Sequence, residues 1–182
     1  MIKLGIGSGI KRFSFKSLLV LALALGLGTI LSACTRNTEQ KIIGIGDRPP
    51  EVRLQSVDGK TVTLADLRGK VVLVHFWATW CPPCVEEIPT LERFSQQVFG
   101  TDIVVLAISV DESADALKTF LEKNKVHFPV LRDPGGKKAG NYGTTKFPET
   151  YVVGRDGIVR YKVIGPMDWS LRSNVEIVRS LL

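Results

Sequence analysis

Two cysteines, Cys81 and Cys84, flank a pair of prolines at a point where the sequence pattern changes. Residues 71–74 before them are all apolar, which is typical of a strand buried on both faces. From residue 85 to residue 94, apolar side chains recur at helical spacing. The pair therefore lies where a strand ends and a helix begins. Prolines fit the first helical turn because its N–H groups have no intrahelical partner.

This position favours redox chemistry. A helix N-terminus carries partial positive charge and unpaired N–H donors, which stabilise a thiolate. We expect Cys81, which precedes the helix, to be exposed and to exchange with a substrate disulfide. Cys84 should turn inward, close enough to form a disulfide with Cys81 and to resolve the mixed disulfide. The alternatives are a structural disulfide or half of a zinc site, but a four-thiolate zinc site needs a second cysteine pair, which the sequence lacks.

The segment Trp80-Cys81-Pro82-Pro83-Cys84 after an apolar strand resembles the active-site motif of the thioredoxin superfamily. The surrounding pattern, over about residues 47–182, is similar to the membrane-tethered extracytoplasmic branch of TlpA- and ResA-like thiol-disulfide oxidoreductases. The resemblance implies an α/β, thioredoxin-like fold. Its central mixed sheet would be flanked by helices, with an added N-terminal β-hairpin and a central insert.

The resemblance also implies a substrate-binding surface beside the cysteines. Thioredoxin-like proteins carry a cis-proline at the start of a strand next to the CxxC motif, and Phe147 and Pro148 match this feature. Their backbone could pair with an extended substrate. Trp80 is assigned to the same surface. The alternative is a trans-proline that ends a loop.

Two ionisable residues are candidates to tune the thiols. Glu87 lies three residues after Cys84, so the two share a helix face. In ResA-like proteins a partly buried Glu at this offset acts near the second thiol, where it would raise the pKa of Cys84 and relay its proton. The alternative is a solvated surface Glu. Thioredoxins carry a proton-accepting Asp where this chain has His75, which we interpret as a neutral, buried, hydrogen-bonded core residue.

Residues 1–33 are interpreted as a lipoprotein signal peptide, with a basic start and an apolar run too short to favour a spanning helix. The tetrapeptide at residues 31–34 resembles the bacterial lipobox, which implies lipidation of Cys34. The alternative is an ordinary secretory signal cleaved after Ala33. Lipidation would use one of the three cysteines and leave a single pair, in a compartment where disulfides persist.

The composition indicates one domain with a substantial core, since 45% of the 182 residues are hydrophobic. The formal charge of +6 falls to +2 without the four basic residues of the leader, so nucleic-acid binding is not indicated. Glycines near the N-terminus lie in the leader and form no phosphate loop. We expect no cofactor and no resident metal.

Residues 34–50 are expected to form a lipidated tether, although residues 41–45 can still pack on the domain formed by residues 51–182. Asp58-Gly59 predicts the turn of the N-terminal hairpin. Ser113 is the expected N-cap of a helix that runs to about residue 125, and Asp168 that of a final helix with Leu171, Val175, Val178 and Leu182 inward. Further strands are expected at residues 52–55, 61–64, 103–109, 128–131, 150–153 and 158–164.

These features predict a lipid-anchored thiol-disulfide oxidoreductase that faces the periplasm or cell exterior. The favoured direction is reduction of disulfides in exported proteins, with regeneration by a membrane thiol electron donor. By resemblance, apocytochrome c thiols could be among the substrates, in cytochrome c biogenesis. Alternatives are a disulfide-forming oxidant, a peroxiredoxin-type peroxidase (Ala78 stands where that family has Thr) and a copper-binding chaperone that would recruit a histidine to the cysteines.

Overall fold

A computed structural model describes residues 41–182. The expected signal peptide, residues 1–33, and the expected lipidation site at Cys34 lie outside the described residues, as does the first part of the tether. Within residues 41–182, no helix combines the length and the apolar character needed to cross a membrane.

Five strands form the main sheet in the order β5-β4-β3-β6-β7. Neighbours β3, β4 and β5 are parallel, whereas β6 runs antiparallel to both β3 and β7. Every residue of the central strand β3 is buried, as its apolar sequence predicts. The strands are β3 (Val71–Trp77), β4 (Ile103–Ser109), β5 (Val130–Arg132), β6 (Glu149–Val153) and β7 (Val159–Ile164).

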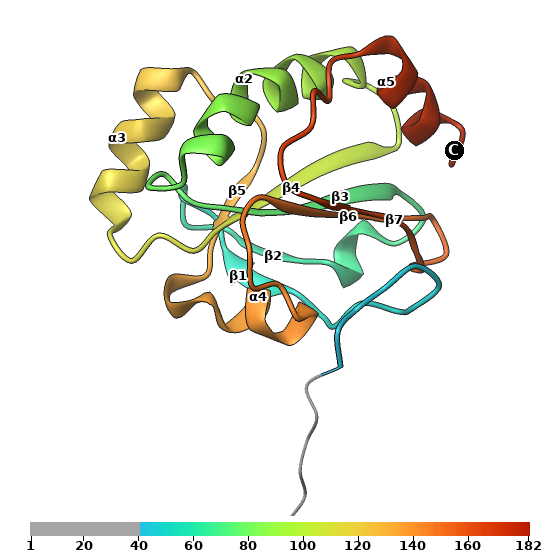
Figure 1. The fold of residues 1–182 in the computed structure, drawn as a ribbon, viewed down its shortest axis with the longest axis horizontal. Coiled ribbons are helices and arrows are strands. Elements are labelled where there is room, and N and C mark those ends of the chain that lie inside the picture. Colours follow the sequence, from blue (N-terminus) through green and yellow to red (C-terminus); the bar gives the residue numbers. More distant parts are fainter. Residues whose placement is uncertain (1–40) are drawn as a thin grey trace, which may run out of the picture. The chain divides into compact units, whose positions relative to one another are not determined.

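Helices cover both faces of this sheet (Figure 1). The parallel pair β3 and β4 needs a crossover, which α2 provides. Figure 1 shows α2 and α5 on one side of the sheet and α4 on the other. The helices are α2 (Pro82–Gln97), α3 (Ala114–Asn124), α4 (Lys137–Tyr142) and α5 (Arg172–Arg179), with short 3₁₀ turns η1 (Ala65–Leu67) and η2 (Pro134–Gly136). The mixed sheet and its flanking helices confirm the predicted thioredoxin-like class.

The predicted N-terminal hairpin is present as β1 (Arg53–Gln55) and β2 (Thr61–Thr63). Gly59 has a φ of +85° in its turn, a conformation that favours glycine. A bridge between Ser56 and Leu131 joins the hairpin to the strand β5.

Part of the segment expected to act as a tether lies against the domain. Ile43 is buried, and its N–H donates to the Tyr142 carbonyl at 3.0 Å. The backbone of Asp47 accepts a bond from the Val159 N–H at 2.9 Å. Backbone groups of this stretch are thus satisfied by the folded domain.

The helix α3 begins as predicted, because the Ser113 hydroxyl accepts a hydrogen bond from the Ala116 N–H at 3.2 Å. It ends one residue before Lys125, whose φ of 51° is left-handed. The strand β5 begins at Val130, two residues later than predicted. The helical turn α4 ends at Tyr142, and its C-cap Gly143 has a φ of 76°.

The prediction that Asp168 caps the last helix is wrong. The helix α5 begins at Arg172 with Leu171 as its N-cap. The Asp168 carboxylate instead accepts bonds from the N–H and the hydroxyl of Ser170, a local turn that competes with capping.

Only part of the predicted inner face of the last helix is correct. Val175 and Val178 are buried, whereas Leu171 and Leu182 are 52% and 45% exposed. Both exposed leucines lie outside the bounds of α5, so the helical period does not apply to them.

Candidate active site

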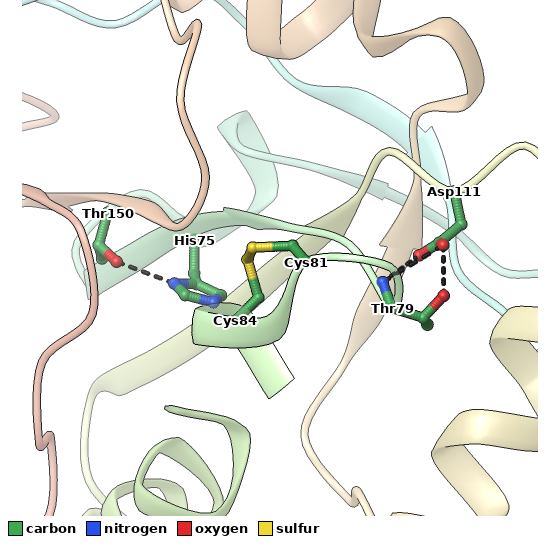
Figure 2. The surroundings of a disulfide bond; sticks show 6 residues. All are labelled: His75, Thr79, Cys81, Cys84, Asp111 and Thr150. Carbon is green, nitrogen blue, oxygen red and sulfur yellow. Dashed lines mark hydrogen bonds between the residues drawn. A yellow bond between two sulfur atoms is a disulfide. The ribbon is translucent and has the colours of Figure 1, made fainter. Parts of the chain in front are cut away.

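Cys81 and Cys84 lie at the junction of β3 and α2 and are joined by a disulfide with a Cα–Cα distance of 5.3 Å (Figure 2). Cys81 is the N-cap of α2, and its carbonyl accepts a bond from the Val85 N–H at 3.1 Å. Pro82 and Pro83 occupy the first helical positions, where no N–H is needed. The strand-to-helix position predicted for the pair is therefore confirmed.

The two cysteines differ in access to solvent. Cys84 is fully buried and Cys81 is 6% exposed. The expectation that Cys81 is exposed is therefore wrong in degree, because in the disulfide its sulfur is tied to a residue inside the core. Of the two residues, Cys81 is still the one with some surface open to solvent.

Aromatic side chains border the disulfide on the exposed side. Trp80 is 64% exposed, and its ring meets Phe147 edge-to-face with centroids 6.1 Å apart. The bond between Phe147 and Pro148 is cis, in agreement with the resemblance. Pro148 directly precedes β6, which pairs with β3 through Glu149 and Phe76 near the end that leads to Cys81. The three residues predicted to bind substrate thus come together at one end of the sheet.

Glu87 is buried, at 2% exposure, so it is not a solvated surface Glu. Its Oε1 accepts hydrogen bonds from the indole N–H of Trp169 at 2.5 Å and from the Met167 N–H at 3.2 Å. Its Oε2 has no partner among the described residues. Burial raises the pKa of Glu87 to about 7, and the two donors oppose this only in part. A proton on Glu87 near neutral pH therefore belongs on Oε2, since Oε1 is occupied as an acceptor.

His75 lies fully buried on β3, and its Nδ1 is 2.9 Å from the hydroxyl of Thr150 on β6 (Figure 2). Its Nε2 has no partner in the described part of the chain. Burial lowers the pKa of His75 to about 3, so the ring is neutral at physiological pH. This confirms the interpretation of His75 as a neutral, hydrogen-bonded core residue.

The loop between β3 and Cys81 is held by Asp111, which sequence reasoning missed. The Asp111 carboxylate accepts bonds from the Thr79 N–H at 3.0 Å and the Thr79 hydroxyl at 2.6 Å (Figure 2). It also accepts a bond from the Ser109 hydroxyl at 2.7 Å. A signal for it existed, because Asp111 follows β4 at the carboxyl end of a strand parallel to β3. Carboxyl ends of parallel strands commonly build active sites.

Trp169 was also missed as the partner of Glu87. The two residues are 82 positions apart, and Trp169 lies in the loop before α5. No local pattern links an indole in such a loop to a carboxylate on a distant helix. Within residues 41–182, no group of three or more His, Cys, Asp and Glu side chains is arranged to hold a metal ion.

Comparison with known proteins assigns the chain to a family. The model of the AhpC/TSA family matches residues 45–162, more than half of the chain. The chain belongs to the AhpC/TSA family. Among its relatives, the thiol-disulfide oxidoreductase ResA of Bacillus subtilis (strain 168) is 34% identical over 154 residues, which are 85% of this chain and 84% of that protein. ResA of Bacillus thuringiensis (strain Al Hakam) is 31% identical over 154 residues, 85% of this chain and 88% of the relative.

A solved structure extends the likeness of this AhpC/TSA protein to its fold. The thiol:disulfide interchange protein of the thioredoxin family from Chlorobium tepidum TLS superposes with a TM-score of 0.65 at 26% identity, covering 76% of this chain and 98% of that one. These relatives are named thiol-disulfide oxidoreductases, and the Cys81–Cys84 disulfide suits thiol-disulfide exchange. The chain is therefore a thioredoxin-like thiol-disulfide oxidoreductase.

Proposed function

We propose that Cys81 and Cys84 are the redox-active pair and that the enzyme works mainly as a reductant of disulfides in exported proteins. The observation that carries this proposal is the disulfide between the N-cap of α2 and a buried residue of its first turn. This arrangement stabilises a thiolate at Cys81 and keeps a second sulfur within bonding distance.

The reaction has two exchange steps. In the dithiol form, the Cys81 thiolate attacks one sulfur of the substrate disulfide, which forms a mixed disulfide and releases the other substrate sulfur as a thiolate that takes up a proton. Cys84 then loses its proton and attacks the Cys81 sulfur. The second substrate sulfur leaves, and the Cys81–Cys84 disulfide forms. Two electrons pass to the substrate, and a membrane thiol electron donor returns two electrons to the pair.

Glu87 is proposed to take the proton that Cys84 must lose. Cys84 is fully buried, so water does not reach its thiol directly. Glu87 lies one helical turn further along α2, and its pKa of about 7 lets it exchange protons near neutral pH. When ionised, the same carboxylate raises the pKa of the Cys84 thiol and so keeps Cys84 protonated until the mixed disulfide has formed.

The substrate is proposed to bind across Trp80, Phe147 and Pro148. Trp80 offers a large exposed aromatic surface next to Cys81, and its edge-to-face contact with Phe147 orders both rings. Ile164 of the edge strand β7, which pairs with Glu149 directly after Pro148, is 66% exposed beside them. An unfolded or extended polypeptide with apolar side chains suits such a surface.

The enzyme is proposed to lie outside the cytoplasm. Residues 1–33 would be removed, and a lipid on Cys34 would anchor the protein to the membrane. The lipobox-like residues 31–34 support this proposal. The partners are exported proteins with thiols or disulfides, among which apocytochrome c is proposed on family resemblance alone.

The proposed roles are tested by trapping the mixed disulfide. The Cys84→Ser variant should accumulate a covalent adduct through Cys81 when mixed with a disulfide-bonded unfolded protein, because the resolving sulfur is absent. The matched variant Cys81→Ser should form little or no adduct at the pair, since the remaining thiol of the pair, that of Cys84, is buried. Mass mapping of the adduct locates the bond. Adducts formed mainly through Cys84, or rapid turnover of peroxide without disulfide exchange, would contradict the proposal.

A further inference from the structure

The turn that carries Cys81 is hydrogen-bonded to one buried carboxylate, that of Asp111. Thr79, two residues before Cys81, directs both its backbone N–H and its hydroxyl to Asp111. Asp111 is 3% exposed, and its N–H donates a hydrogen bond to the Ser109 hydroxyl at 3.0 Å. The same hydroxyl donates to the Asp111 carboxylate, so the two bonds orient it. The carboxylate is thus held from both strand ends, β3 through Thr79 and β4 through Ser109.

Hydrogen-bond donors surround the Asp111 carboxylate. All of its side-chain partners, two hydroxyls and one N–H, donate to it. Within residues 41–182, no Lys, Arg or His forms an ion pair with Asp111, in contrast to Asp102 and Asp156. The groups that hydrogen-bond the Asp111 carboxylate are therefore neutral donors, which do not neutralise its charge.

Cys81 is such a neighbour. Consecutive Cα atoms are about 3.8 Å apart, so Cys81 lies within roughly 8 Å of Thr79 along the chain. The bend is tight, because the Cys81 N–H donates to the Ala78 carbonyl at 3.3 Å. Figure 2 shows Thr79 and Asp111 on the side of Cys81 that faces away from His75. The Asp111 carboxylate contacts Thr79 directly, so its fixed negative charge lies beside the turn that carries Cys81, where a negative charge disfavours a thiolate and opposes the dipole of α2.

We propose that Asp111 is a positioning residue that fixes the Cys81 turn through Thr79 and, by its charge, makes the Cys81 thiolate less stable, so that the pair is a stronger reductant. This inference rests on the proposed role of Cys81 as the attacking sulfur. The oxidised pair carries no charge, whereas the reduced pair carries the thiolate. A charge that destabilises only the reduced form shifts the equilibrium towards the disulfide.

Other ionisable groups lie on the elements packed around the pair, among them His75 on β3, Glu87 on α2 and the buried Glu149 on β6, which is ion-paired with Lys162 at 3.1 Å. His75 on β3 is neutral in the range of interest, and Glu87 on α2 ionises near pH 7. The comparison is therefore made in the Glu87→Gln background as well as in the native sequence, so that titration of Glu87 is not mistaken for that of Cys81.

The test measures the pKa of the Cys81 thiol from the pH dependence of its alkylation rate in the reduced protein, with mass mapping to separate Cys81 from Cys84. Asp111→Asn keeps the shape and removes the charge, and should lower that pKa by about one unit. The exchange equilibrium with glutathione, above the thiol pKa, should move towards the dithiol by up to tenfold, which corresponds to about 30 mV. Thr79→Val, which removes one bond but keeps the charge, should not lower the pKa.

The direction in which the pKa of the Cys81 thiol changes in Asp111→Asn distinguishes an effect of charge from an effect of positioning alone. If Asp111 only held the loop, its loss would loosen Cys81 from the helix N-terminus and raise the thiol pKa, and a raised or unchanged value in Asp111→Asn would overturn the inference. If that variant does not fold, Asp111→Ser, which also removes the charge, takes its place in the same assay. A lowered pKa of the Cys81 thiol is again the expected result, and a raised or unchanged value would overturn the inference. Preferential alkylation of Cys84 in the native protein would instead refute the proposed function.

Discussion

Replacing Glu87 by Gln should remove a loss of stability that the native protein suffers as the pH rises through neutrality. The burial of Glu87 raises its pKa from the ordinary 4.5 to about 7. The folded state therefore binds more protons than the unfolded state between these two values, so the free energy of unfolding falls as the pH rises through this window. The contribution of Glu87 is fully present below pH 4.5 and is lost above about pH 7.

The size of the effect follows from the shift. One pKa unit corresponds to about 1.4 kcal/mol, so a shift of roughly 2.5 units makes the native protein lose about 3 kcal/mol relative to the variant between pH 4 and pH 8. Gln at this position is neutral at every pH. Its carbonyl can accept the bonds that Oε1 accepts from Trp169 and Met167, so the variant should resemble the protonated native protein.

The assay is urea unfolding of the oxidised proteins at a series of pH values, followed by Trp fluorescence. With the disulfide intact, the thiols do not titrate. The difference in unfolding free energy between the native protein and Glu87→Gln cancels the contributions of other groups. Curves that run parallel from pH 4 to pH 8 would refute the reasoning, because they would show that Glu87 ionises without a cost in the folded protein.

The remaining predictions concern the opposite end of the pH scale and the membrane anchor. The pKa of His75 is lowered to about 3, so its contribution to stability is present above pH 6.5 and is lost as the pH falls. In the same unfolding assay, the native protein should lose about 3 kcal/mol relative to His75→Asn between pH 7 and pH 4. Equal losses in the two proteins would contradict this. Cys34→Ser should move the protein from the membrane to the soluble fraction on cell fractionation, because the lipid has no attachment point; unaltered membrane association would rule out the lipid anchor.

Much of the fold could be predicted because its signals are local. The apolar run of β3, the helical spacing in α2 and the Asp-Gly turn of the first hairpin each lie within a few residues. The CPPC segment could be placed at a strand-to-helix junction for the same reason, and this placement is what identifies Cys81 and Cys84 as reactive candidates.

The polar contacts of the site were harder to predict because they join distant parts of the chain. Glu87 meets Trp169 across 82 residues and Thr79 meets Asp111 across 32. No periodicity reports such pairs, and only the topology brings them together. The sequence therefore allowed either a buried or a solvated Glu87. Glu87 is buried because the loop before α5 packs against α2.

Local competition explains the error at Asp168. The residue has the type and the place of an N-cap, yet its carboxylate accepts hydrogen bonds from the N–H and the hydroxyl of Ser170, and α5 begins only at Arg172. Choosing between two local hydrogen-bonding patterns depends on how the loop packs, which the sequence does not state.

The reduction potential of the Cys81–Cys84 pair tests the central claim most directly. The protein is equilibrated with redox buffers of defined potential, and the fraction of dithiol is counted by alkylation and mass spectrometry at these two positions. A pair that reduces protein disulfides should show one reversible two-electron transition close to the thioredoxin value of about −270 mV. A disulfide that stays intact well below about −300 mV would behave as a structural bond and contradict the account, and a value near −120 mV would reverse the proposed direction.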